Sequence, residues 1–411
     1  MADFTVAQEL ASIRDSLIEF IDNEVVPLEQ EHKDLLFDER RRYDARGRLA
    51  PEVLELKRRV RMRSAELGYY TLFGDAELGG AGLGVEAVVV LFEALYRRYG
   101  PGRVLIDDVV IPSLFTNGLS PVLRFLPEHL RQRYLPAIAS GEKTLCFALT
   151  EPDAGSDVWN LRTRAVRDGD HWVINGSKQF ITNGPYADYC MLFAVTNPEL
   201  KEQRKGGITG FFVDTSWPGF RCETVLPIMG QLGGEIAILH FDDLRVPADH
   251  VLGEVDHAFH VAFTGIDKGR VGIAAKCLGL SLWALDQAVA YAGVRRTFGR
   301  PIGDHGQVQA LLADCAIEIY ALKSMLQNVA WRIDRGETPV KEISIVKAFG
   351  TEAANRIFDR CMQVHGGMGL TNQLRLVEGY RWARSMRIPD GTTEIQRRTI
   401  ARRLLRGDTD F

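Results

Sequence analysis

The sequence predicts an α+β protein of several domains, with a helical N-terminal domain, a middle β domain and a helical C-terminal domain. Hydrophobic residues recur at helical spacing along most of the first 100 residues. From about residue 145, short segments rich in β-branched and aromatic residues alternate with turn signals, and after about residue 253 long helical patterns return. We place the domain boundaries at 1–143, 144–253 and 254–411.

Composition narrows the class of protein. The chain has 411 residues, of which 46% are hydrophobic and 25% charged, and its formal net charge is −4. These values are typical of a globular protein, and they lack the excess positive charge expected for binding nucleic acid or anionic lipid. The longest uncharged stretch, residues 109–123, contains two prolines and a glycine and is too short to span a bilayer. We therefore expect no nucleic-acid partner and no membrane insertion.

The cysteines and the N-terminal residues indicate the cellular compartment of the protein. The N-terminal 20 residues have no basic region followed by an apolar core. Six cysteines are scattered without any CxxC pairing, in a chain large enough to fold without disulfides. We expect a cytoplasmic protein whose cysteines are reduced and mostly buried.

The N-terminal domain should contain helices at residues 6–21, 51–67 and 85–99, with Pro27 closing the first helical segment. Five glycines lie within residues 73–84, between the second and third helix. This segment has neither GxxxxGK[ST] nor a GxGxxG after a strand, so an irregular surface loop is favoured over a phosphate cradle.

The middle domain is expected to consist of short strands, two of them joined by a hairpin at Asn175-Gly176. The C-terminal domain should contain long helices at residues 259–294, where alanines and glycines allow close packing, and at 341–364 and 392–405.

Two kinds of site are disfavoured. His257 and His260 share a helix face, but no HExxH or ExxH pairing accompanies them, so we expect no metal site. A GxSxG nucleophile motif is also missing, and hydrolase chemistry is not supported.

Five motifs carry the functional signal: LTEPDAGSD at 149–157, KQFITNG at 178–184, RRTFGRPI at 295–302, QVHGGMGLT at 363–371, and DGTTEIQ from Asp390. In this order they resemble the flavin-dependent acyl-CoA dehydrogenase family over nearly the whole chain. The resemblance implies a middle β-barrel, a C-terminal four-helix bundle, FAD as cofactor and an acyl-CoA substrate. It also implies an electron acceptor such as electron-transfer flavoprotein, and a homotetramer or homodimer whose subunits share FAD.

Site residues follow from the same resemblance. Those expected to bind the flavin and its ribityl and phosphate groups are Phe147, Leu149, Thr150, Gly155, Ser156, Phe180, Thr182, Thr392 and Glu394. Those expected to reach the adenosine diphosphate part of a partner subunit's FAD are Arg295, Thr297, Phe298, Gln363, Gly366 and Gly367. Substrate contacts are expected from Ser156, Asp267 and Arg270, although the last two also suit a simple i,i+3 ion pair.

The catalytic position departs from the family pattern, because Asp390 stands where Glu usually precedes Gly-Thr. Asp390 is our candidate base for the α-proton, and its main-chain N–H can still hydrogen-bond the thioester carbonyl. The shorter side chain leaves three alternatives open: a flavin oxidase resembling nitroalkane oxidase, another carboxylate as base, or a non-catalytic flavin- or acyl-binding scaffold. The other family position for the base is Gly269, which cannot serve.

A second departure affects the cofactor. Gly306 stands where the family commonly has Gln, and Gln307 or Gln309 could supply the missing contact.

Overall fold

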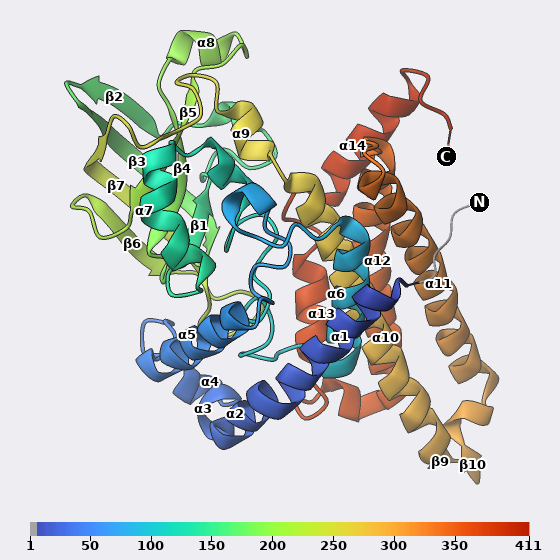
Figure 1. Cartoon of the computed structure of the whole chain (residues 1–411). Coiled ribbons are helices and arrows are strands. Elements are labelled where there is room, and N and C mark those ends of the chain that lie inside the picture. The colour runs from blue at the N-terminus through green and yellow to red at the C-terminus, as the bar shows by residue number, and fades with distance from the viewer. Residues whose placement is uncertain (1–5, 411) are drawn as a thin grey trace. The chain divides into compact units, whose positions relative to one another are not determined.

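The structure is a computed structural model that describes residues 6–410 (Figure 1). By internal contacts the chain divides into two units. The bundle unit comprises residues up to 21, 83–103 and from 267 onward, and the sheet unit comprises 22–82 and 104–266. Each unit is therefore built from segments far apart in sequence.

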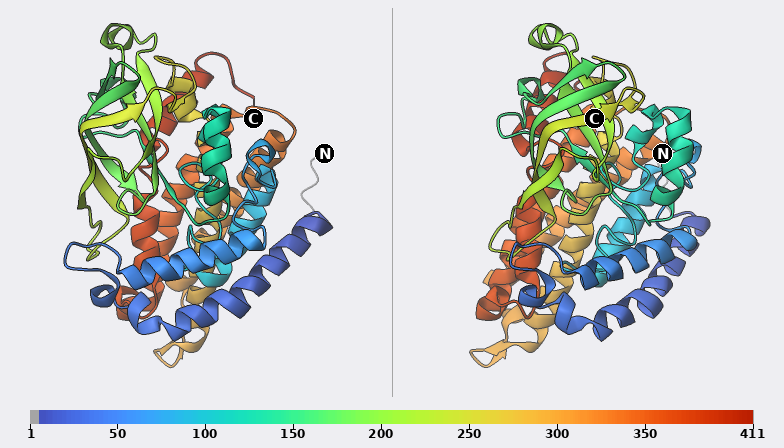
Figure 2. Two further views of the ribbon diagram at one scale, coloured as in Figure 1. Left: turned by 60° about the vertical axis from the view of Figure 1, so that its left-hand side comes forward. Right: turned by 90° about the vertical axis from the view of Figure 1, so that its left-hand side faces the viewer.

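Helices dominate the bundle unit. They are α1 (Gln8–Phe20), α6 (Val85–Tyr99), α10 (Ile266–Val294), α11 (Gly306–Asp334), α12 (Val340–His365), α13 (Leu376–Ser385) and α14 (Thr393–Leu404). The hairpin β9 (Arg296–Thr297) and β10 (Arg300–Pro301) and the 3-10 turns Ile302–Asp304 and Gly366–Leu370 complete it. In both views of Figure 2 the hairpin projects from one end of the long helices. The expected helices at 85–99, 341–364 and 392–405 are confirmed within one or two residues.

Close packing in the bundle depends on small residues, as expected. A Cβ added at Gly279 of α10 would lie 2.7 Å from Tyr96 Cβ and 2.8 Å from Phe92 O of α6. One at Gly350 of α12 would lie 3.3 Å from Ala274 of α10. α10 therefore packs against both α6 and α12, and nearly all of its residues from 271 to 284 are buried.

One stretch, residues 259–294, is long and apolar enough to cross a membrane by length and composition alone. Half of its most apolar part lies buried inside the protein, as in the core helix of a bundle, so this finding is weak evidence for a span.

The sheet unit contains one mixed sheet of eight strands within the described chain, with strand order β6-β7-β3-β2-β4-β5-β8 and β1 added beside β4. The strands are β1 (Leu145–Ala148), β2 (Arg164–Asp168), β3 (His171–Thr182), β4 (Tyr189–Val195), β5 (Ile208–Asp214), β6 (Phe220–Val225), β7 (Ile236–Pro247) and β8 (Val251–Leu252). The helices are α2 (Val26–Glu31), α3 (Lys33–Leu36), α4 (Glu39–Arg42), α5 (Pro51–Glu66), α7 (Glu128–Ala139), α8 (Pro198–Glu202) and α9 (Phe259–Phe263), with a π turn at Ile21–Val25 and 3-10 turns at Ala76–Leu78, Pro121–Phe125 and Val158–Asn160.

Alternation along β4 separates two cores. Met191 and Phe193 join a cluster with Tyr134 of α7, whereas Cys190 and Leu192 join a cluster made by the strands themselves. Within the second cluster, Trp172 of β3 contacts Phe211 of β5 with ring centroids 5.6 Å apart, although the two strands are not neighbours in the sheet. The sheet therefore curls around this inner cluster.

The prediction of a hairpin turn at Asn175-Gly176 is wrong. Strand β3 runs straight through both residues, and the turn from β2 lies at Gly169 and Asp170. Gly176 marks a register shift against β7, and a Cβ there would lie 2.7 Å from Thr163 Cα. Asn-Gly thus forms a bulge, because pairing with β7 outweighs the local turn preference.

Pro27 does not end the first helical segment. It lies in the first turn of α2, where its missing N–H costs no hydrogen bond.

The glycine-rich segment is a tightly packed turn rather than a phosphate cradle. A Cβ at Gly80 would lie 2.1 Å from Gly74 O, so the backbone folds on itself. The following helix N-terminus, α6, is already capped by Asp334, whose carboxylate accepts hydrogen bonds from Val85 N at 2.7 Å and Glu86 N at 2.8 Å.

Candidate active site

Asp390 lies in the loop between α13 and α14 and adopts a left-handed conformation with φ 55°, followed by Gly391 with φ 92°. Aspartate tolerates this region better than most residues, whereas a Cβ at Gly391 would lie 2.7 Å from Gln396 Nε2. Among residues 6–410, no hydrogen bond or ion pair engages the Asp390 carboxylate. A carboxylate that is largely buried at a strained loop and free of protein hydrogen-bond partners is suited to taking a proton from a ligand.

Two main-chain carbonyls of this loop are held by three side chains of the bundle. Asp390 O accepts from Arg270 Nε at 3.0 Å and from Gln396 Nε2 at 3.0 Å. Gly391 O accepts from Lys347 Nζ at 2.8 Å and from Gln396 Nε2 at 3.1 Å. These donors come from α10, α12 and α14, so three helices fix one loop.

Electrostatics give Asp390 the properties of a base. Burial raises the pKa of Asp390 to about 6, while Lys347 and Arg270 oppose the increase. Burial also lowers the pKa of Lys347 to about 8. A carboxylate with this pKa is largely ionised at neutral pH and still basic enough to accept a proton.

Asp267 and Arg270 form the i,i+3 ion pair, with Arg270 Nη1 and Asp267 Oδ1 3.0 Å apart. Arg270 also donates its Nε–H to Asp390 O at 3.0 Å. The structure thus brings Arg270 to the candidate base, and the predicted contacts of both residues with substrate stay a prediction.

In the sheet unit, the turn after β1 carries Leu149 and Thr150 and is fixed to β3. Gln179 N donates to Thr150 O at 2.9 Å, and Lys178 Nζ donates to Leu149 O at 2.9 Å. Lys178 also pairs with Glu151 at 2.7 Å, with both side chains almost fully buried. Thr150 is therefore held beside the strand that carries Phe180.

Glu151 and Lys178 were not predicted as site residues, although both stand in quoted motifs. Glu151 accepts hydrogen bonds from Arg162 N and Thr163 N as well. Burial alone would raise the pKa of Glu151, but Lys178 and these donors hold it below its usual value. Burial lowers the pKa of Lys178 to about 8. A lysine between strand-forming residues was the signal that could have indicated this pair.

Phe180 is an exposed aromatic residue in a strained conformation. Its φ is 59°, 58% of its surface is accessible, and it lies at a break in register between Lys178 and Ile181. Thr182 is exposed two residues further on. The hydroxyls of Thr150, Ser156 and Thr182 make no hydrogen bond within the described part of the chain. This face thus offers a flat ring and free hydroxyls to a ligand.

Phe147 and Gly155 show no strained backbone or exposed ring of the kind found at Phe180. The Phe147 ring packs partly buried between Phe115 and Phe193, with centroids 4.9 and 5.1 Å away. Gly155 is exposed, and a Cβ there would meet no atom within 4 Å.

A second group of predicted residues gathers at one end of the bundle unit. The Tyr291 ring stacks on His365 at 4.6 Å, which brings the end of α10 beside the turn that begins with Gly366. Arg295 and Gln363 are exposed there and have no side-chain partner among residues 6–410. Gly366 has φ 57°, and neither it nor Gly367 has any atom within 4 Å of a Cβ position, so the backbone is open to a ligand.

The β9–β10 hairpin carries Phe298, which is 96% exposed with φ 50°. Thr297 Oγ1 lies 3.3 Å from His305 Nε2. Gln309 donates its amide to Gly303 O at 2.9 Å, and a Cβ at Gly306 would meet open space. The first turn of α14 uses Thr392 as its N-cap, accepting from Ile395 N at 3.3 Å, and exposes Glu394.

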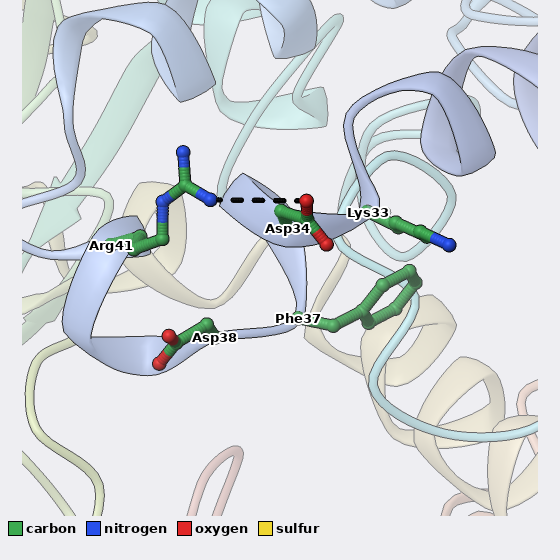
Figure 3. Close-up of a pocket in the computed structure, with 5 residues that line it drawn as sticks. All are labelled: Lys33, Asp34, Phe37, Asp38 and Arg41. Carbon is green, nitrogen blue, oxygen red and sulfur yellow. Dashed lines mark ion pairs between the residues drawn. The ribbon is translucent and has the colours of Figure 1, made fainter.

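The pocket in Figure 3 belongs to the sheet unit. It is lined by Lys33, Asp34, Phe37, Asp38 and Arg41, with Arg41 and Asp34 4.0 Å apart. Its charges balance, and it contains no predicted site residue. In residues 6–410 no cluster of three or more His, Cys, Asp or Glu could hold a metal ion.

The bundle unit thus contains an unpaired carboxylate at Asp390, and the sheet unit displays the aromatic ring of Phe180. Three family models match in succession: the acyl-CoA dehydrogenase N-terminal domain at 7–142, the middle domain at 146–244 and the C-terminal domain at 257–405. Human mitochondrial short-chain specific acyl-CoA dehydrogenase is 36% identical over 340 residues, covering 83% of this chain and 81% of the relative.

A further relative and a solved structure are similar to the chain and agree with these family matches. Caffeyl-CoA reductase-Etf complex subunit CarC of Acetobacterium woodii is 32% identical over 362 residues, 88% of this chain and 91% of the relative. A solved structure described as the FAD complex of PigA matches with a TM-score of 0.81 and 25% identity, over 98% of this chain and 99% of that chain. The chain belongs to the acyl-CoA dehydrogenase family, whose members are oxidoreductases acting on CH–CH groups, and the expected fold class and enzyme class are confirmed.

Proposed function

We propose that this protein introduces an α,β double bond into an acyl-CoA thioester with Asp390 as the catalytic base. The observation that carries the proposal is the Asp390 carboxylate, which has no partner among the described residues and a pKa of about 6. In the reaction the α-proton passes to an Asp390 carboxylate oxygen. Bound FAD supplies the acceptor for the β-hydrogen, which leaves as hydride.

Charge that develops on the thioester carbonyl oxygen needs hydrogen-bond donors. The Asp390 main-chain N–H is our candidate donor, because Arg270 and Gln396 bond the carbonyl of the same residue and so fix its backbone. Side-chain length does not affect this role, so replacement of Glu by Asp leaves it intact.

We propose FAD as the cofactor because the residues present fit it. Phe180 offers an exposed ring at a β-bulge, and Thr150, Ser156 and Thr182 offer free hydroxyls. At the far end of the bundle unit, the Arg295 guanidinium and the open glycine turn suit a diphosphate. The solved FAD complex of PigA shares the fold.

A homotetramer or homodimer is proposed from the length of α10. Arg270 near Asp390 and Arg295 near the glycine turn are 25 residues apart on or just past this helix, a separation of roughly 37 Å at 1.5 Å per residue. Arg295 is therefore far from the base of its own chain, which supports its predicted role toward a neighbouring subunit's FAD.

Electron-transfer flavoprotein is proposed as the acceptor, supported by the relative named as a subunit of an Etf complex. We propose a cytoplasmic location, supported by Cys146, Cys190, Cys277, Cys315 and Cys361 being buried packing residues, as predicted.

The proposal is tested by titrating the purified, FAD-loaded protein with butyryl-, isovaleryl-, octanoyl- and palmitoyl-CoA under argon. We expect at least one thioester to bleach the flavin and to yield its enoyl-CoA. Rapid peroxide formation in air without an acceptor protein would assign an oxidase instead. A colourless protein that cannot be reconstituted with FAD would assign a scaffold.

A further inference from the structure

Lys347 is a charged residue in the interior of the bundle. It lies on the buried face of α12 with 0% of its surface accessible. Within residues 6–410 its ammonium forms no ion pair, and its hydrogen bond goes to Gly391 O at 2.8 Å. Burying an ammonium without a carboxylate partner is costly, so the position needs an explanation beyond packing.

The carbonyl that Lys347 holds belongs to the residue after the candidate base. Together with Arg270 and Gln396 it forms what we call the carbonyl clamp, four hydrogen bonds on the carbonyls of Asp390 and Gly391. Two of the three donors are cationic, and charge-assisted bonds resist rotation of the peptide planes they engage.

A strained loop persists only where its surroundings over-determine it. Asp390 and Gly391 both have positive φ, 55° and 92°. Rotation of either peptide would move the Asp390 carboxylate and N–H together. A displacement of about 1 Å is enough to cost roughly a hundredfold in rate.

We propose that Lys347 is a positioning residue for proton transfer, which through Gly391 O holds the Asp390 loop and through its charge favours the ionised carboxylate. This inference rests on the proposed function of Asp390. Lys347 acts through the loop and not by contact with substrate or cofactor.

Charged and titratable groups around the pair come from three helices. Asp390 faces Lys347 of α12 and Arg270 of α10. Lys347 in turn faces Asp390, Cys277 and Arg270 of α10, and Glu394 of α14. Both cations lower the pKa of Asp390, so removal of Lys347 is expected to raise it.

Lys347→Met tests the proposal, with Lys341→Met as the matched control. Lys341 is an equally buried lysine on α12, but it donates to Asp408 and Asp410 instead of the loop. With butyryl- or octanoyl-CoA as probe, Lys347→Met should lower the rate of flavin reduction at pH 7 about tenfold. In the pH–rate profile, the fall in rate on the acid side should shift upward by about one pH unit. KM should change less than threefold. Lys347→Arg should return the acid side of the pH–rate profile to its wild-type position, and Lys341→Met should not shift it.

A second measurement needs neither flavin nor substrate. The stability difference between the wild type and Asp390→Asn is followed by urea unfolding from pH 4 to 8. Because the folded pKa of Asp390 is raised, the wild type loses stability relative to the Asn variant as pH rises, until the difference levels off above about pH 6. The same comparison is then made with Lys347→Gln, which keeps an N–H donor, added to both proteins. The stability difference should then become constant at a pH about one unit higher.

The role of Lys347 would be overturned if its substitution shifted neither the acid side of the pH–rate profile nor the pH at which the stability difference becomes constant. This holds even if acyl-CoA bleaches the flavin. If no thioester bleaches the wild type, the proposed function fails, and the unfolding series still decides whether Lys347 controls Asp390.

Discussion

Removal of Lys178 should destabilise the protein strongly, because it would leave the Glu151 carboxylate buried without its cation. Lys178 and Glu151 are 0% and 4% exposed, and their 2.7 Å contact lies at the junction of β3 with the Thr150 turn. In Lys178→Met, Glu151 keeps only the amide donors of Arg162 and Thr163.

The size of the effect follows from burial. Deleting one partner of a buried ion pair typically costs about 3–5 kcal/mol, and solvent cannot reach this site to reduce that figure. An exposed pair in the same unit provides the comparison. Lys143 and Asp188 are similarly close, 2.8 Å apart, but 41% and 30% exposed, so Lys143→Met should cost less than about 1 kcal/mol.

Urea unfolding of the apoprotein measures both variants, and equal m-values show that the same surface unfolds. The double variant Glu151→Met with Lys178→Met removes both charges and should be more stable than Lys178→Met by at least about 1 kcal/mol. The reasoning is refuted if Lys178→Met costs no more than Lys143→Met, or if the second substitution brings no recovery.

Three further outcomes are expected. Flavin reduction by acyl-CoA should fall about tenfold between pH 7 and pH 5, because Asp390 with a pKa of about 6 becomes protonated; stopped-flow spectra measure this, and a flat profile would contradict it. Asp334→Ala should lower the free energy of unfolding by about 1–2 kcal/mol, since Val85 N and Glu86 N lose their cap, whereas Ala at the exposed Asp359 should have no effect in the same urea experiment. Phe180→Ala should weaken FAD binding to the apoprotein about tenfold in a fluorescence titration while leaving apoprotein stability unchanged, because the ring is exposed; loss of stability with unchanged affinity would assign it to packing.

Sequence reasoning succeeded where a feature is local. The helix α6 is set by the apolar periodicity of residues 85–99, and Asp390 is found because its neighbours Gly391 and Thr392 complete a short motif. It failed at Asn175-Gly176, where a turn preference of two residues yields to the long pairing of β3 with β7. There Asn175 exchanges two hydrogen bonds with Asp243, which no local rule foresees.

The supporting groups of the site were missed for a related reason. Lys347 is 43 residues before Asp390, and Lys178 is 27 residues after Glu151, so neither pair shares a motif. Lys347 does stand between two buried apolar residues, Val346 and Ala348. A lysine on the apolar face of a predicted helix or strand is the signal that such pairs leave in a sequence.

The central claim is that the Asp390 carboxylate removes the α-proton. Exchange of the α-hydrogen of butyryl- or octanoyl-CoA with D₂O, followed by NMR on the FAD-loaded protein under argon, tests it most directly in Asp390→Asn. The amide cannot accept the proton but fills the same space, so exchange and flavin bleaching should both fall by about 10²- to 10⁴-fold, with FAD content unchanged. Exchange and bleaching at wild-type rates in this variant would contradict the assignment.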